Sequence, residues 1–255
     1  MFMQVVNTGS THGNCYVLKS NSGEMLLLDC GCRYKDILKA IDYRTSDVSG
    51  VLLTHEHGDH RESFKNLMNL GIQIYTNDET VEHLQIITGE LMKGVPEKRP
   101  FRVGSFTVIP FYLPHTTRDK DTGQLIPCFN YGYIVEHEEM GKLLYMTDFE
   151  FCRYNFKAMR LNHLVIECNY CNELVDKTAE NYAHRLKGHC SLDTCKRLVN
   201  TNHTAALRTV TLVHLSNEAA DQEAILKEVK AVVGNDVLVQ VARPGLEVNL
   251  DLCPF

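Results

Sequence analysis

Short apolar runs separated by glycine-containing turns open the chain and predict a set of β-strands. The runs have the length that is typical of strands, and they are followed by apolar residues at helical spacing. Ile37, Leu38 and Ile41 would share one face of a helix over Tyr34–Ile41. The predicted strands of this part are Met3–Val6, Cys15–Lys19 and Met25–Asp29.

Strands and helices continue to the end of the chain. Further strands are predicted at Val51–Thr54, Ile72–Tyr75, Phe106–Tyr112, Asn130–Val135, Leu143–Met146, Leu164–Ile166 and Val210–Val213. Helices are predicted around Phe64–Met68, over Asp78–Met92, after a Ser191 cap and after an Asn217 cap. Val237–Val241 and Leu246–Leu250 are predicted to close the fold as a hairpin around Pro244-Gly245. This order predicts an α/β fold, a four-layer αβ/βα sandwich formed by one domain over residues 1–255.

Composition places the chain among globular proteins. Its 255 residues are 44% apolar and 23% charged, and no stretch has the features of a signal peptide or a membrane span. We therefore expect a cytoplasmic protein, in which the ten cysteines are free thiols rather than a disulfide framework. The net charge of −6 and the lack of a Lys/Arg-rich run argue against strong nucleic-acid binding through the bulk surface.

Candidate chemistry is concentrated in one six-residue segment with the pattern H-x-H-x-D-H. His55, His57, Asp59 and His60 follow the apolar run Val51–Leu53, so a strand end would hold the first ligand rigidly. Imidazole and carboxylate together suit Zn²⁺ and similar divalent ions. Four ligands on one tight loop are enough to serve two ions.

Three more polar residues follow predicted strands and are candidate ligands for the same ions. His115 comes after Phe106–Tyr112, Asp148 after Leu143–Met146, and His214 after Val210–Val213. Each residue alone also fits a capping or buried structural role. Their order behind the H-x-H-x-D-H segment favours a shared metal site.

With these motifs in this order, nearly the whole chain resembles the metallo-β-lactamase superfamily, whose fold is the αβ/βα sandwich. The resemblance implies two Zn²⁺ ions, although the ligand set also tolerates Mn²⁺. It assigns His55, His57 and His115 to the first ion, Asp59, His60 and His214 to the second, and Asp148 as the bridge between both.

Two further residues indicate a branch of that superfamily. Glu167 follows the strand Leu164–Ile166, and His189 stands in Gly-His-Cys-Ser before a helix. This pair resembles ribonuclease Z-like phosphodiesterases, in which a carboxylate orients an imidazole that protonates the leaving oxygen. The loop Gly9–Asn14 and the His-Leu-Ser element at His214 are similar to the YycJ-type branch, which is associated with nuclease activity. Phage anti-Pycsar enzymes, which hydrolyse cyclic mononucleotides, are similar in size and site.

The resulting hypothesis is a dinuclear zinc phosphodiesterase that cleaves a nucleotide by attack of a metal-bridged hydroxide. Asp59 would help to orient the hydroxide, while His189, oriented by Glu167, would act as the proton donor. The acidic balance and the lack of an obvious RNA-binding arm favour a small nucleotide, with a cyclic mononucleotide slightly ahead of DNA or RNA. A YycJ-like nuclease is the main alternative. A lactone or thioester metallohydrolase and a non-catalytic metal-stabilised domain are the others.

Secondary expectations concern partners and the remaining histidines. Related enzymes are often homodimers, so a homodimer is an open alternative, and no membrane partner is expected. The polar segment Cys171–Lys187 is expected to be a solvated helix face, with a lid over the site as the alternative. The other histidines with polar or helical neighbours are expected at the surface, namely His83, His137, His163, His184 and His203.

Overall fold

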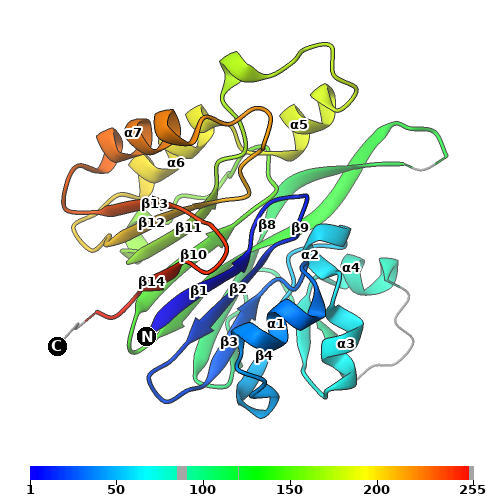
Figure 1. Ribbon diagram of the computed structural model, residues 1–255, viewed down its shortest axis with the longest axis vertical. Coiled ribbons are helices and arrows are strands. Elements are labelled where there is room, and N and C mark those ends of the chain that lie inside the picture. The colour runs from blue at the N-terminus through cyan, green and yellow to red at the C-terminus, as the bar shows by residue number, and fades with distance from the viewer. Residues whose placement is uncertain (85–90, 120, 253–255) are drawn as a thin grey trace. The chain divides into compact units, whose positions relative to one another are not determined.

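Two seven-stranded mixed sheets form the framework of the computed structural model, which describes residues 1–84, 91–119 and 121–252 (Figure 1). The first sheet has the order β14-β1-β2-β3-β4-β5-β6, and the second has the order β13-β12-β11-β10-β9-β8-β7. By their contacts the residues divide into two compact units, of which the first is 1–111, 133–141 and 242–255, and the second is 112–132 and 142–241. No helix in the described part of the chain is long and apolar enough to cross a membrane.

The first sheet lies in the first unit and changes from antiparallel to parallel pairing at β3. Its strands are β14 (Glu247–Asn249), β1 (Phe2–Asn7), β2 (Cys15–Lys19), β3 (Met25–Leu28), β4 (Val48–Leu52), β5 (Ile74–Thr76) and β6 (Met92–Gly94). The pairs from β14 to β3 are antiparallel, and those from β3 to β6 are parallel. Every residue of β3 is buried, as expected for a central strand that is covered on both faces.

The second sheet contains a parallel block that belongs almost entirely to the second unit. Its strands are β13 (Leu238–Val241), β12 (Thr209–Val213), β11 (His163–Glu167), β10 (Gly141–Met146), β9 (Leu125–His137), β8 (Phe106–Arg118) and β7 (Phe101–Val103). The pairs from β10 to β13 are parallel, so their carboxyl ends meet at one edge of the sheet. Functional side chains at such an edge are held by the rigid strands behind them.

Helices cover the sheets within each unit. They are α1 (Tyr34–Ala40), α2 (Gly58–Arg61), α3 (Phe64–Asn69), α4 (Asp78–His83), α5 (Tyr182–Gly188), α6 (Leu192–Asn202) and α7 (Gln222–Val233). In the first unit α1 packs on β1, and in the second unit α6 packs on β11 and on α7. Ser191 caps α6 by accepting a hydrogen bond from the Thr194 amide, as predicted, an interaction worth about 1 kcal/mol.

Several predicted boundaries are wrong, each for a physical reason. The chain does not end in a hairpin, because β13 pairs with β12 in the second sheet and β14 pairs with β1 in the first. The cap of α7 is Asp221 and not Asn217, since the Asp221 carboxylate accepts from the amides of Glu223 and Ala224.

The helix predicted over Asp78–Met92 is also shorter than expected. It ends at His83, and Met92 already begins β6, which pairs with β5. Residues 85–90 of this predicted helix, like Cys253 among the cysteines, lie outside the described residues.

The strands β8 and β9 are longer than the apolar pattern predicted, because polar and proline-containing segments continue them. Their turn is closed by hydrogen bonds between Asp119 and Gln124 and between Gly123 and Asp119. In Figure 1 the part of this hairpin within 112–132 extends past α5 in the second unit. The chain therefore carries a projecting segment that the sequence pattern did not reveal.

Candidate metal and phosphodiester site

The first unit carries the H-x-H-x-D-H segment at the end of β4. His55 is fully buried, while Asp59 and His60 lie on the one-turn helix α2, where a loop was predicted. The ring centroids of His57 and His60 lie 4.5 Å and 4.4 Å from that of His55. Three imidazoles are thus gathered around one point of this unit.

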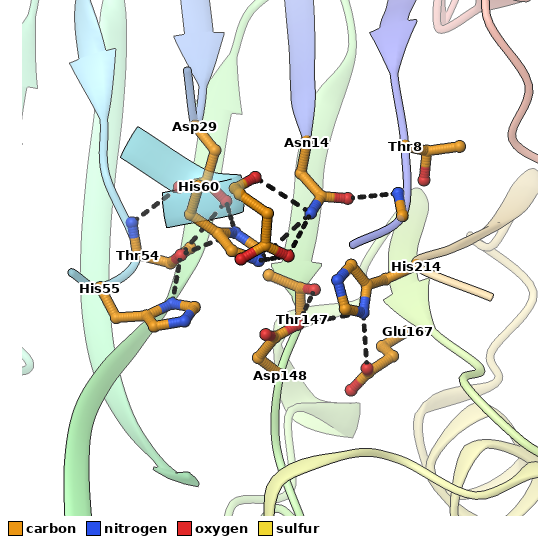
Figure 2. Close-up of polar contacts among 12 residues, drawn as sticks. Thr8, Asn14, Asp29, Thr54, His55, His60, Thr147, Asp148, Glu167 and His214 are labelled. Atoms are coloured by element: carbon orange, nitrogen blue, oxygen red, sulfur yellow. Dashed lines mark hydrogen bonds and ion pairs between the residues drawn. The ribbon is translucent and has the colours of Figure 1, made fainter. Parts of the chain in front are cut away.

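The Asp29 carboxylate accepts a hydrogen bond from Nδ1 of His60. Its Oδ2 lies 2.8 Å from His60 Nδ1, and its two oxygens accept from the Thr54 amide at 2.8 Å and the Thr54 hydroxyl at 3.1 Å (Figure 2). Since a carboxylate only accepts, Nδ1 of His60 carries the proton and Nε2 carries the lone pair. Metal-binding histidines are oriented by this kind of partner.

Asn14 fixes the other side of the same imidazole. Its amide nitrogen lies 3.2 Å from His60 Nε2 and 3.2 Å from the Asp59 carbonyl oxygen, to which it donates (Figure 2). Its oxygen accepts from the Gly9 amide at 2.9 Å, which ties the Gly9–Asn14 loop to the segment. A donor on Nε2 agrees with the tautomer that Asp29 imposes.

The second unit gathers the other predicted ligands at the carboxyl edge of its parallel strands. Asp148 follows β10, His214 follows β12, and His115 lies within β8 rather than after a strand as predicted. His115 Nδ1 donates to the Gly188 carbonyl oxygen at 2.8 Å, which leaves the lone pair on Nε2, 3.8 Å from Asp148 Oδ2. All three side chains are almost completely buried.

Glu167 joins two imidazoles of this unit. Its Oε1 lies 2.7 Å from His189 Nδ1 and 3.0 Å from His214 Nδ1, and Figure 2 shows the contact with His214. Its Oε2 accepts from the amides of Phe149 at 3.2 Å and Cys190 at 3.0 Å. One fully buried carboxylate therefore has four donors, which stabilise its charge.

The donor set in the second unit fits a metal ion. One atom each of Asp148, Glu167, His189 and His214 lie within 4.8 Å of one another. His115 and His214 both give Nδ1 to an acceptor, so Nε2 of each presents a lone pair, as a bound ion requires. His and Asp groups that are able to bind metal ions are therefore present in both units.

Backbone strain marks three of the site residues. Asp29, Asp148 and His214 have φ values of 56°, 52° and 54°, and each is the first or second residue after a buried strand. Non-glycine residues adopt this left-handed conformation at an energetic cost, and such residues are concentrated at functional sites. The strain turns each side chain sharply at the edge of its sheet.

Some site residues were not predicted. Asp29 was read only as the end of a strand, although a carboxylate after a buried strand in the same sheet as His55 was an available signal. His184, expected at the surface, is half-buried with its ring near those of His115 and His189. His137 and His163 are also wrongly assigned to the surface, because both are buried and bonded to hydroxyls of Ser105 and Thr209.

A comparison with protein families identifies the superfamily of this chain. The model of the β-lactamase superfamily domain matches residues 25–215. The chain belongs to the β-lactamase superfamily. This confirms the predicted fold class, an α/β sandwich of the metallo-β-lactamase type, and the predicted class of enzyme, a metal-dependent hydrolase.

The chain is similar to several known proteins. The chain is 30% identical over 187 residues to the exodeoxyribonuclease YycJ of Bacillus anthracis, a match that covers 69% of this chain and 65% of that protein. The metallo-β-lactamase fold protein YhfI of Bacillus subtilis has a similar structure, with a TM-score of 0.72, 20% identity and coverage of 97% and 98% of the two chains. The short form of human tRNase Z gives a TM-score of 0.65 at 17% identity over 99% and 100% of the chains. These two structures show the fold alone.

Proposed function

We propose that this chain is a metal-dependent phosphodiesterase and that its substrate is a DNA strand. The observation that carries the proposal is the contact between Glu167 and His189, at 2.7 Å, next to Asp148 and His214. A buried carboxylate on the far nitrogen of an imidazole is the arrangement that a proton donor for a leaving oxygen needs. Hydrolysis of a lactone or a thioester does not need this donor to the same degree.

We propose that residues of both units hold two metal ions and that these ions are Zn²⁺, as the resemblance implies. His55, His57 and His115 would hold one ion, Asp59, His60 and His214 would hold the other, and Asp148 would serve both. We take residues 1–255 as the single domain that supplies them. Bound ions would acidify a water molecule and neutralise the charge on the phosphate oxygens.

The protein side chains then have separate tasks in the reaction. Asp59, with its carboxylate partly exposed beside His60, would orient the attacking water. His189 is 14% exposed and keeps its Nε2 without a hydrogen-bond partner among the described residues, so this nitrogen is the one to meet the substrate. With Nδ1 bonded to Glu167, protonated His189 donates from Nε2 to the departing sugar oxygen.

The choice of DNA follows from the YycJ relative, whose printed activity is that of an exodeoxyribonuclease. The β8–β9 hairpin also removes one of the two reasons for favouring a small substrate, because the chain does have a projecting segment. A cyclic mononucleotide and a homodimer both stay predictions from the sequence.

The test is zinc-dependent hydrolysis of single-stranded DNA, RNA, a 3′,5′-cyclic mononucleotide and a simple lactone by the full chain. We expect DNA cleavage that falls about 100-fold or more in His189→Ala, since general acid catalysis contributes about 10²–10⁴-fold. His203→Ala, which removes a half-buried imidazole at the end of α6, is the matched control and should retain full activity.

The outcomes separate the candidate substrates. Turnover of the cyclic mononucleotide alone would replace DNA by the small nucleotide, and turnover of the lactone alone would overturn the role of His189. A fully metal-loaded protein that cleaves none of these substrates would indicate a metal-stabilised domain without this activity.

A further inference from the structure

A third imidazole stands beside the proposed proton donor. The ring of His184 on α5 lies 5.5 Å from that of His189 at an interplanar angle of 85°, and 5.9 Å from that of His115. An angle near 90° is the edge-to-face arrangement that aromatic rings prefer. His184 is therefore in contact with the two histidines that flank Gly188, although its sequence context suggested a solvated helix face.

His184 is itself fixed to the sheet. Its Nδ1 lies 3.3 Å from the Thr116 hydroxyl oxygen, which belongs to β8, one residue after His115. Arg118 on the same strand donates to the Glu180 carbonyl oxygen at 2.6 Å, which ties the segment before α5 to β8 a second time. The imidazole thus has a defined place on a rigid strand, as a positioning group requires.

Gly188 makes this arrangement possible. A Cβ atom added to Gly188 would lie 3.1 Å from the His115 ring and 3.2 Å from the His184 ring. Both distances are shorter than an ordinary van der Waals contact. The space left by the absent side chain is what lets the imidazoles approach from both sides.

His189 is held by one hydrogen bond and by contacts with other rings. Glu167 binds its Nδ1, the His214 ring stacks on it at 5.3 Å and 16°, and the rings of His184 and His115 meet it edge-on at 85° and 70°. The hydrogen bond to Glu167 alone allows the ring to tilt about the Nδ1 contact. Ring contacts of different orientation restrict this tilt and thereby the direction of Nε2.

We propose that His184 is a positioning residue that acts through His189, and that it aims Nε2 of His189 at the leaving oxygen of the phosphodiester. The inference rests on the function proposed above. A misplacement of a catalytic group by about 1 Å costs on the order of 10²-fold in rate. We therefore expect His184→Ala to lower kcat for DNA about 10–100-fold with little change in KM.

The test compares two leaving groups. An alkoxide leaving group, as in a dinucleotide, needs protonation, whereas nitrophenolate from bis(p-nitrophenyl) phosphate is stable as an anion and needs little. His184→Ala and His189→Ala should both lose activity on the dinucleotide and stay within about 3-fold of the original chain on the nitrophenyl ester. The double variant should be no worse than His189→Ala, because residues that act as a unit are not additive.

Two conservative variants distinguish positioning from general support of the structure. His184→Phe keeps a ring edge against His189 and should restore most of the dinucleotide activity, while His184→Asn keeps a polar partner for Thr116 and should not. Metal content is measured for every variant. Equal loss on both substrates, loss of metal, or equal activity of the Phe and Ala variants would overturn the inference.

The result also separates this inference from the proposed function. If the original chain hydrolyses neither phosphodiester, the proposed function fails. If His189→Ala shows the leaving-group dependence and His184→Ala behaves like the original chain, the function stands and the role of His184 is refuted.

Discussion

Replacing Asp29 with asparagine removes the charge behind His60 while it keeps the shape of the side chain. Asparagine tolerates the φ of 56° at this position, so the backbone should not change. Its oxygen can still accept from the Thr54 amide, as Asp29 Oδ1 does at 2.8 Å. Its nitrogen, however, would then face His60 Nδ1, so that two N–H donors would point at each other.

Moving the His60 proton to Nε2 relieves the conflict at Nδ1. The same move takes away the lone pair that we assign to a metal ion and turns the proton toward the Asn14 amide nitrogen, 3.2 Å away. The exchanged contact is a charge-assisted hydrogen bond, worth about 1.5–3 kcal/mol. Loss of such an outer partner lowers metal affinity by about 10–100-fold. The metal-free protein keeps a neutral hydrogen bond at Nδ1 but loses the contact of Nε2 with Asn14, so its free energy of unfolding should fall by about 1–3 kcal/mol.

Zinc affinity is measured by competition with a chelator of known affinity, and stability by urea unfolding of the metal-free protein. Asp42→Asn is the matched control, because Asp42 also has a positive φ, of 51°, but its side chain is 74% exposed. We expect this control to leave zinc affinity unchanged and to alter stability by less than about 0.5 kcal/mol. Unchanged affinity for both equivalents of zinc in Asp29→Asn would refute the claim that this carboxylate sets the tautomer of His60.

Four other outcomes are expected. Gly188→Ala should lower phosphodiesterase activity without unfolding the chain, because its Cβ would lie 3.1 Å from the His115 ring; full activity would show that the ring can move at no cost. Prolonged treatment with a chelator should abolish activity and added Zn²⁺ should restore it, measured with bis(p-nitrophenyl) phosphate. Cys152, the one described cysteine that is not buried, should be alkylated before the other described cysteines in a mass-spectrometric time course at neutral pH, because the reagent can reach it; burial raises the pKa of both thiols, and that of Cys190 well above its usual value. Burial also raises the pKa of Tyr170 to about 12, so its phenol should still be protonated at about pH 11 in an ultraviolet titration, which Tyr170→Phe identifies by difference; its contribution to stability is present below about pH 10 and is lost as the pH rises toward 12.

Most of the strands that carry the candidate site could be predicted, because a polar ligand directly after an apolar run is visible in the local sequence. His55, Asp148 and His214 each follow a run of buried residues, and the strands behind them are confirmed. Asp29 also follows a buried run, but its role as the partner of His60 could not be assigned from the sequence, since 31 residues separate the two and only the fold brings them together. Local pattern likewise does not tell which strand a segment pairs with.

The exposure of His137 and His163 was also predicted wrongly, for a related reason. His163 has polar neighbours in the sequence, but in the structure its Nδ1 meets the Thr209 hydroxyl at 2.9 Å, 46 residues away. A satisfied hydrogen bond offsets the cost of burying the ring. Such partners across strands are invisible in the sequence, so a polar context alone is a poor guide to exposure.

The double contact of Glu167 with His189 and His214 has a consequence for how this protein can change over evolutionary time. In a lineage that abandoned catalysis but still needed the ion for folding, position 189 would be free to vary, while position 167 would remain under selection through His214. Glu167 could not be lost before His189, because a chain without this carboxylate would lose the orientation of His189 and that of His214 at the same time. Descendants that retain the fold as inert metal-binding domains should therefore keep the acid and lose the imidazole that it once aimed.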